Sequence, residues 1–221
     1  MVPAVVHLVR HAEGYHQLPH DHPDVNIHDP SLTPRGIKQS LRFGAKFPYI
    51  AQTTHLYASP LRRTLQTTML AFKLEMASGL RVVALPDAQE ATDAPSDTGS
   101  DITVLRNEFG DAVSYEHVGG AWYEKTGGNA TDVSSLHHRA KRLRVWLRSQ
   151  APDGGQIVVV THGIFAHYLT GHIDEQGIQT GEYWTNVMWR SFVFGDTDDS
   201  NATFIETEES EHRAAKKELS E

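Results

Sequence analysis

The chain has 221 residues, of which 39% are hydrophobic, so it is long enough for one domain with a buried core and short for two. Its formal net charge of −8 predicts a surface that repels nucleic acid and anionic membranes, and we expect neither as a partner. The absence of cysteine excludes disulfides, thiolate zinc sites and cysteine nucleophiles.

The sequence favours a cytoplasmic location. The first residues lack the basic and long apolar regions of a secretory signal, and no apolar run approaches the roughly 20 residues that cross a bilayer. A protein without cysteine also fits a reducing compartment.

The first predicted strand and helix flank a polar stretch. The β-branched run at 5–9 predicts a buried strand, and a segment rich in His, Asp and Pro follows at 14–30. Thr33 and Pro34 are typical of a helix start, and Pro48 ends the helix. Its buried face is predicted to contain Ile37, Leu41 and Ala45.

A second strand and helix lead to a long irregular segment. We predict a strand at 55–58, a helix from Ser59-Pro60 and a third strand at 81–85. The buried face of that helix should contain Leu61, Leu65, Thr68 and Phe72. The segment 87–129 has little periodicity apart from a helical patch near 102–109, and segments of this length are often functional lids.

The rest of the chain repeats the alternation of helix and strand. A helix is predicted over 132–150, a buried strand at 157–160 and a helix over 163–170, before two closing strands at 188–194 and 202–205. The apolar face of the first of these helices consists of Val133, Leu136, Ala140, Leu143 and Leu147. We expect one domain over 1–207 and a charged, frayed tail over 208–221.

Strands that alternate with helices predict an α/β three-layer sandwich, in which helices cover both faces of a mainly parallel sheet. Ligands bind such folds beyond the carboxyl ends of the strands. Four separate predicted strands deliver charged or imidazole side chains to that edge: Arg10 and His11, Arg62 and Arg63, Glu90, and His162.

This set of side chains suits phosphoryl transfer. The transferring group carries negative charge that fixed cations must offset, and the planar fork of arginine holds two oxygens at once. A neutral imidazole can attack phosphorus and form a phosphohistidine, which divides the reaction into two displacements. A carboxylic acid can protonate the leaving oxygen and then activate water.

Four segments, in order, resemble motifs of the histidine phosphatase superfamily, whose fold is that of phosphoglycerate mutase. LVRHAEG at 8–14 is similar to Leu-x-Arg-His-Gly-Glu, and DPSLTPRG at 29–36 to Asp-x-x-Leu-Thr-x-x-Gly. SPLRRTLQT at 59–67 resembles Ser-Pro-Leu-x-Arg-Ala-x-Gln-Thr, and VTHG at 160–163 resembles Val-x-His-Gly. The resemblance is strongest to a small phosphatase branch of fungal type.

The resemblance implies a role for each matching residue. His11 would be the nucleophile, and Glu90 the general acid. His162 would be catalytic and would also bind the phosphate together with Arg10 and Arg63; Arg63, rather than Arg62, has the spacing of the family. Gln17 stands where many members place a phosphate-binding asparagine, and Ala12 replaces the usual glycine.

The resemblance implies a metal-independent histidine phosphatase of the acid type that has no cofactor and hydrolyses a small phosphorylated metabolite through phosphohistidine. Two alternatives remain. One is a phosphoglycerate-type mutase, which returns the phosphate to its product, and the other is a family member that catalyses a non-hydrolytic reaction or only binds its ligand. The segment 87–129 would recognise the leaving group.

Some residues allow competing interpretations. Asp87 and Asp93 are neighbouring candidates for the acid, although we favour Glu90. The histidines of the polar stretch could suggest a metal site, but the composition favours a surface loop from which His16 reaches the pocket mouth; the others are His20, His22 and His28.

Two further groups of side chains could have functional or structural roles. The basic residues of the 132–150 helix are interpreted as its solvated outer face rather than as a nucleic-acid site: Arg139, Lys141, Arg142, Arg144 and Arg148. The aromatic residues of the 87–129 segment could line a substrate pocket or form a small core: Tyr115, Trp122 and Tyr123.

Overall fold

A sheet with the strand order β4-β3-β2-β5-β1-β6-β7 forms the centre of the computed structural model, which describes residues 2–19, 21–22, 25–195 and 202–218. Five strands run parallel: β1 (Val5–Arg10), β2 (Thr53–Ala58), β3 (Val82–Ala84), β4 (Val113–Ser114) and β5 (Gln156–Thr161). Strand β6 (Trp189–Phe194) pairs antiparallel with β1, and β7 (Phe204–Glu206) pairs antiparallel with β6.

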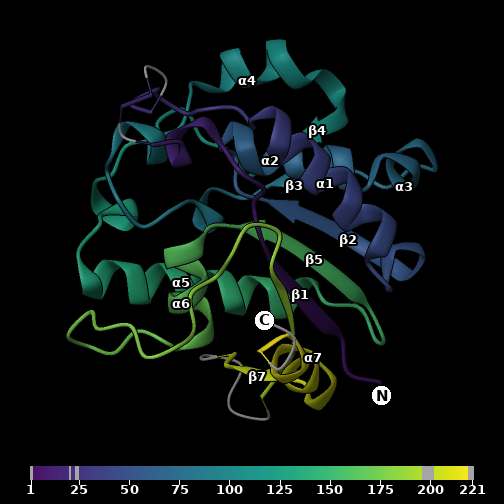
Figure 1. The fold of residues 1–221 in the computed structure, drawn as a ribbon. Helices are drawn as coiled ribbons and strands as arrows, with labels where there is room; N and C mark the ends of the chain where they lie inside the picture. The colour runs from purple at the N-terminus through teal and green to yellow at the C-terminus, as the bar shows by residue number, and fades with distance from the viewer. Residues whose placement is uncertain (1, 20, 23–24, 196–201, 219–221) are drawn as a thin grey trace.

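Helices cover both faces of this sheet (Figure 1). Helices α1 (Pro34–Lys46) and α2 (Arg62–Ala71) lie on one face, and α5 (Val133–Gln150) and α6 (Gly163–Thr170) lie on the other. Because side chains alternate along a strand, Leu8 joins the core under α5 and α6, whereas Val9 joins the core under α1 and α2. The predicted three-layer α/β fold is confirmed.

The buried face of α1 differs from the prediction. Ile37 and Leu41 are 41% and 49% exposed, and Ala45 is exposed as well. The face toward the protein instead consists of Gly36, Ser40, Phe43 and Gly44. The reason is the closeness of α2: a Cβ atom on Gly44 would lie 2.1 Å from the carbonyl oxygen of Ala71. Gly44 therefore lies against α2 and Phe43 packs into the core, while Ile37 and Leu41 point outward.

The segment 87–129 contains more regular structure than its pattern predicts. Helix α4 (Ile102–Phe109) lies in the predicted patch, and β4 extends the sheet beyond β3. Trp122 and Tyr115 are buried in the same core as α1 and α2, and the indole N–H of Trp122 donates to the Ser100 carbonyl over 3.0 Å. These two aromatic side chains therefore belong to the core. A short helix, α3 (Lys73–Ala77), was also not predicted.

The C-terminal segment forms a helix where the sequence predicts a frayed tail. Helix α7 (Glu208–Glu218) packs beside β6, and residues 219–221 lie outside the described part. The Arg213 guanidinium lies 3.5 Å from the centre of the Trp189 ring, and the Tyr49 hydroxyl donates to Glu209 over 2.5 Å. These contacts are polar or cation–π, so the helix needs no apolar stripe. No helix in the described ranges is long and apolar enough to cross a membrane.

Candidate active site

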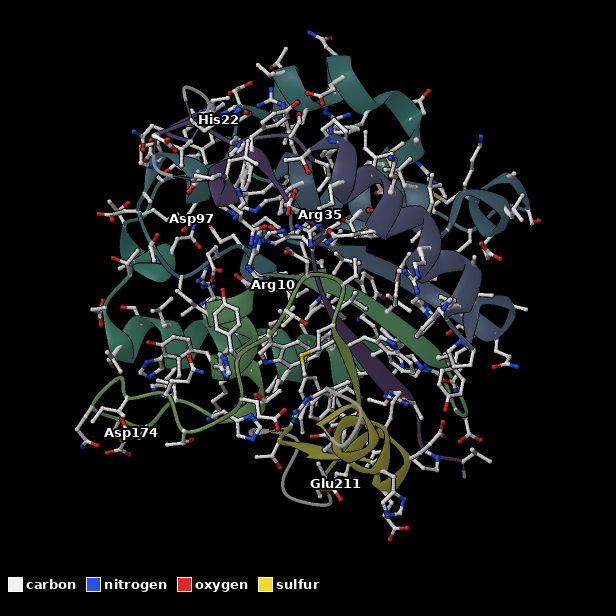
Figure 2. All side chains as sticks on the ribbon, in the orientation of Figure 1. Arg10, His22, Arg35, Asp97, Asp174 and Glu211 are labelled. Atoms are coloured by element: carbon white, nitrogen blue, oxygen red, sulfur yellow. The ribbon has the colours of Figure 1, made fainter. Side chains whose placement is uncertain are left out.

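His11 and His162 meet because they follow two neighbouring strands. In the parallel pair of β1 and β5, Arg10 lies opposite Thr161, so the next residue of each strand emerges at the same edge. The two imidazole rings are buried, and their centres are 5.1 Å apart. Figure 2 shows nitrogen atoms gathered around the Arg10 label at this edge, while Asp174 and Glu211 lie well away from it.

Arg63 links the two histidines. It lies in the first turn of α2 and is fully buried. Its Nε–H donates to Nε2 of His11 over 3.2 Å, and its Nη2 group lies 3.0 Å from Nδ1 of His162. A guanidinium only donates, so both imidazole nitrogens act as acceptors here. Their lone pairs therefore face the same cation.

The protonation of both imidazoles follows from their partners. Nδ1 of His11 lies 2.7 Å from the Ala12 carbonyl, which only accepts, so Nδ1 carries the proton and Nε2 carries the lone pair. The other nitrogen of His162, Nε2, lies 2.9 Å from the Ser59 hydroxyl. Burial, and then the charge of Arg63, hold the pKa of both histidines well below the usual value. Both rings are therefore neutral.

Arg10 brings a second cation to the histidines. It is buried, and its Nη1 group donates to the Trp184 carbonyl. A Cβ atom on Gly163 would lie 3.3 Å from the Arg10 Nε atom, so the glycine at the start of α6 gives this side chain its space. The Nε–H has no hydrogen-bond partner in the described part of the protein.

Asp97 forms an ion pair with Arg63, and the sequence pattern does not indicate that Asp97 belongs to the site. Nη2 of Arg63 donates to Oδ1 of Asp97 over 2.8 Å, and Nη1 donates to the Ser96 carbonyl. The other carboxylate oxygen accepts from the Thr92 hydroxyl over 2.5 Å. Both partners come from the segment 87–129, whose pattern contained no signal for them. This segment thus holds the guanidinium in its orientation.

Glu90 is buried at the start of α6. Its carboxylate accepts from the backbone N–H of Phe165 over 2.9 Å and from that of Ile164 over 3.3 Å, at the positive end of the helix dipole. Burial, and then the negative charge of Asp97, raise the Glu90 pKa. Of its competitors, Asp87 pairs with Arg142 at 2.6 Å, and Asp93 is exposed.

Gln17 and Arg62 form hydrogen bonds and ion pairs with residues other than the two histidines of the site. Oε1 of Gln17 accepts from the Asn186 side chain over 2.9 Å and from the Gly14 N–H over 3.2 Å, so it joins two loops. Arg62 pairs with Glu108 at 2.6 Å and with Asp29 at 3.5 Å, and it also donates to Ser100. Arg62 thus fixes the segment 87–129 onto α2.

The polar stretch brings one histidine close to His11. The His16 ring is 5.6 Å from that of His11, and burial, followed by the charges of Arg63 and Arg10, lowers its pKa to about 3. His20, another of the histidines considered for metal binding, lies outside the described residues. In the ranges that the structure describes, no group of three or more potential ligand side chains could hold a metal ion.

Two basic side chains close to Glu90 were not expected there. Lys125 is largely buried, which lowers its pKa to about 7. Arg139 is only 1% exposed, which corrects its interpretation as part of a solvated face. Its guanidinium lies 4.2 Å from the centre of the Phe165 ring. The contact between Arg139 and Phe165 could not be predicted from the apolar stripe of α5, because the position of Phe165 depends on where α6 begins.

Comparisons with known proteins agree with this fold. A family model described as the histidine phosphatase superfamily (branch 1) matches residues 6–198. No curated protein matches the chain by sequence.

Three solved structures illustrate the likeness. The ecdysone phosphate phosphatase of Bombyx mori, solved with tungstate, has a TM-score of 0.63 at 16% identity, over 92% of each chain. A phosphoserine phosphatase of Entamoeba histolytica, solved with 3-phosphoglyceric acid, has a TM-score of 0.55 at 20% identity, over 93% of this chain and 98% of that one. A mycobacterial glucosyl-3-phosphoglycerate phosphatase has a TM-score of 0.58 at 15% identity, over 91% and 96%.

Proposed function

The chain belongs to the histidine phosphatase superfamily, and we propose that it is a phosphomonoester phosphatase that acts through a phosphohistidine at His11. The observation that carries the proposal is the unprotonated Nε2 atom of His11, which faces Arg63 over 3.2 Å at the edge of the sheet. A nucleophile next to a fixed cation is the arrangement that phosphoryl transfer requires.

In the first step, Nε2 of His11 forms a bond to phosphorus while the bond to the ester oxygen breaks. Arg10 and Arg63 offset the charge of the non-bridging oxygens, and His162 lies beside them, 3.0 Å from the Nη2 group of Arg63. Glu90 gives its proton to the leaving oxygen, so the product departs as an alcohol. The raised pKa of Glu90 supports this role, because the acid must be protonated before the first step.

In the second step, the Glu90 carboxylate takes a proton from a water molecule whose oxygen attacks phosphorus. The bond between nitrogen and phosphorus breaks, inorganic phosphate forms, and the His11 imidazole returns to its neutral state. Fixed arginine side chains supply the positive charge in both steps, so the proposal includes neither a metal ion nor a cofactor.

The substrate in this proposal is a small phosphorylated metabolite. The three solved structures described above are named as phosphatases of ecdysone phosphate, phosphoserine and glucosyl-3-phosphoglycerate, which are themselves small phosphorylated compounds. The proposal places the protein in the cytoplasm, which its lack of cysteine supports.

Two measurements on purified protein test this function. Release of inorganic phosphate from a generic aryl phosphate is expected for the wild type and not for His11→Ala. Substrate labelled in its phosphate should leave an acid-labile label on the wild type only. With 3-phosphoglycerate as substrate, formation of the 2-phospho isomer instead of free phosphate would favour the mutase.

A further inference from the structure

Two basic side chains meet at one backbone oxygen, the carbonyl of Glu90. Nζ of Lys125 donates to this oxygen over 3.0 Å, and Nη2 of Arg139 donates to it over 3.1 Å. Lys125 also donates to the side-chain oxygen of Gln89 over 2.7 Å. The peptide that carries the proposed acid is therefore fixed from two directions.

We propose that Lys125 is a positioning residue, which holds Glu90 where it can give its proton to the leaving oxygen, through its bonds to the Glu90 carbonyl and the Gln89 side chain. This inference rests on the proposed function, because it needs Glu90 to be the acid.

The burial of Lys125 supports a role beyond ordinary packing. Removal of an ammonium group from water is unfavourable unless specific partners compensate for it. After burial, the charges that shift the Lys125 pKa are those of Arg139 and of three members of the site, Asp97, Glu90 and Arg63. Conversely, Lys125 adds to burial and to the charges of Arg63 and His11, which together lower the pKa of His162. A lysine from the segment 87–129 therefore lies among the catalytic groups although it bonds neither histidine directly.

The two basic residues hold Glu90 from different parts of the fold. Arg139 comes from α5 and packs on Phe165, so it belongs to the framework beneath the site. Its Nε and Nη1 atoms have no partner among the described residues. Lys125 comes from a segment outside the helices and strands, 35 positions along the chain from Glu90. Lys125 therefore couples the position of Glu90, near the start of the segment 87–129, to the far end of the same segment.

Glu90 is also held through its carboxylate. The N–H groups of Ile164 and Phe165 fix the carboxylate at the start of α6, directly after His162. Proton transfer requires the acid within hydrogen-bond reach of the leaving oxygen, about 2.6–3.2 Å. A shift of the Glu90 backbone would lengthen that contact. Loss of Lys125 should therefore slow the step that needs the proton more than the attack of His11.

The test compares esters that need this proton to different degrees. Lys125→Met should reduce kcat/KM for an alkyl phosphate by about tenfold or more, which is part of the ~10²–10⁴-fold typical of acid–base assistance. An aryl phosphate of an acidic phenol should lose much less. In a Glu90→Gln background, Lys125→Met should add almost no further loss for the alkyl phosphate, because both changes remove the same assistance.

Three additional variants complete the experiment. Lys141→Met, on the exposed side of α5, is the matched control and should leave both esters unchanged. Lys125→Arg keeps the charge and the donors and should restore most of the lost activity, which a general packing defect would not predict. If Lys125→Met does not fold, Lys125→Gln takes its place in the same comparison.

Several outcomes would overturn the inference. Lys125→Met could slow both esters equally, or its effect could add fully to that of Glu90→Gln. It could also raise KM for every ester while kcat stays constant, which would make Lys125 a substrate contact. These results differ from failure of the proposed function, in which the wild type releases no phosphate or His11→Ala stays active.

Discussion

Arg63 donates its Nε–H to Nε2 of His11 over 3.2 Å, so the atom proposed to attack phosphorus already faces a cation in the free protein. The same guanidinium pairs with Asp97, which belongs to the segment 87–129. The charge of Arg63 also helps to keep His11 neutral, after burial, which is the larger cause of its lowered pKa. A single arginine therefore connects the nucleophile with the segment 87–129.

His11→Ala should lower phosphatase activity by a factor of about 10³ or more, because the variant lacks the nucleophile. The ring lies at the edge of the sheet, so circular dichroism should report an unchanged fold. Phosphate release and acid-labile labelling measure the effect. Full activity of the variant would exclude a phosphohistidine at this position.

Glu90→Gln should slow esters with poor leaving groups most, because the amide cannot protonate the departing oxygen. Phosphates of acidic phenols need little protonation and should lose much less than the ~10²–10⁴-fold typical of acid–base assistance. The measurement is kcat/KM across leaving groups of different pKa. Asp87→Asn and Asp93→Asn are the controls and should show no such dependence. If one of them does and Glu90→Gln does not, the acid is misassigned.

Asp97→Asn should move the pH dependence of the enzyme toward lower pH. The charge of Asp97 contributes to the raised pKa of Glu90, so a neutral asparagine should lower that pKa. Activity on alkyl phosphates requires protonated Glu90 and falls as pH rises through its pKa, and this fall should begin at lower pH in the variant. Profiles of kcat/KM against pH test the shift. A shift to higher pH would contradict the proposed coupling.

Activity should persist in an excess of a metal chelator. In the proposed mechanism, Arg10 and Arg63 supply the positive charge that a metal ion supplies in other phosphatases. Phosphate release from an aryl phosphate, with and without chelator, provides the measurement. Loss of activity that added zinc or magnesium restores would instead point to a metal site, with the histidines of the polar stretch as first candidates.

Gly44→Ala should destabilise the fold by about 1–3 kcal/mol, the usual effect of an overpacked core. The added methyl group would lie 2.1 Å from the Ala71 carbonyl oxygen, so α1 and α2 would have to move apart. Gly119→Ala is the matched control, since a Cβ atom there meets nothing within 4 Å. Urea unfolding of both variants measures the difference. Equal stability of the two would show that the helices adjust without cost.

The strands and most helices could be predicted because their pattern is local. The β-branched run of β5 predicts a buried strand from its composition alone, and the buried face of α2 repeats at helical spacing. The close approach of α1 to α2 was not visible in this way. This approach depends on which face of α1 meets α2. Here the face that meets α2 contains Gly44, whereas Leu41 lies on the exposed face.

The α/β fold and the meeting of His11, Arg63 and His162 at one edge could be predicted from the amino-acid pattern, because parallel strands leave their carboxyl ends on the same side. The other charges at that edge became apparent only from the packing of the folded chain. Asp97 and Lys125 come from a segment without periodicity, whose path is set by contacts distant in sequence, such as that of Trp122 with Ser100. Local patterns report what a short stretch of backbone prefers, whereas these positions arise from packing between stretches that no short pattern contains.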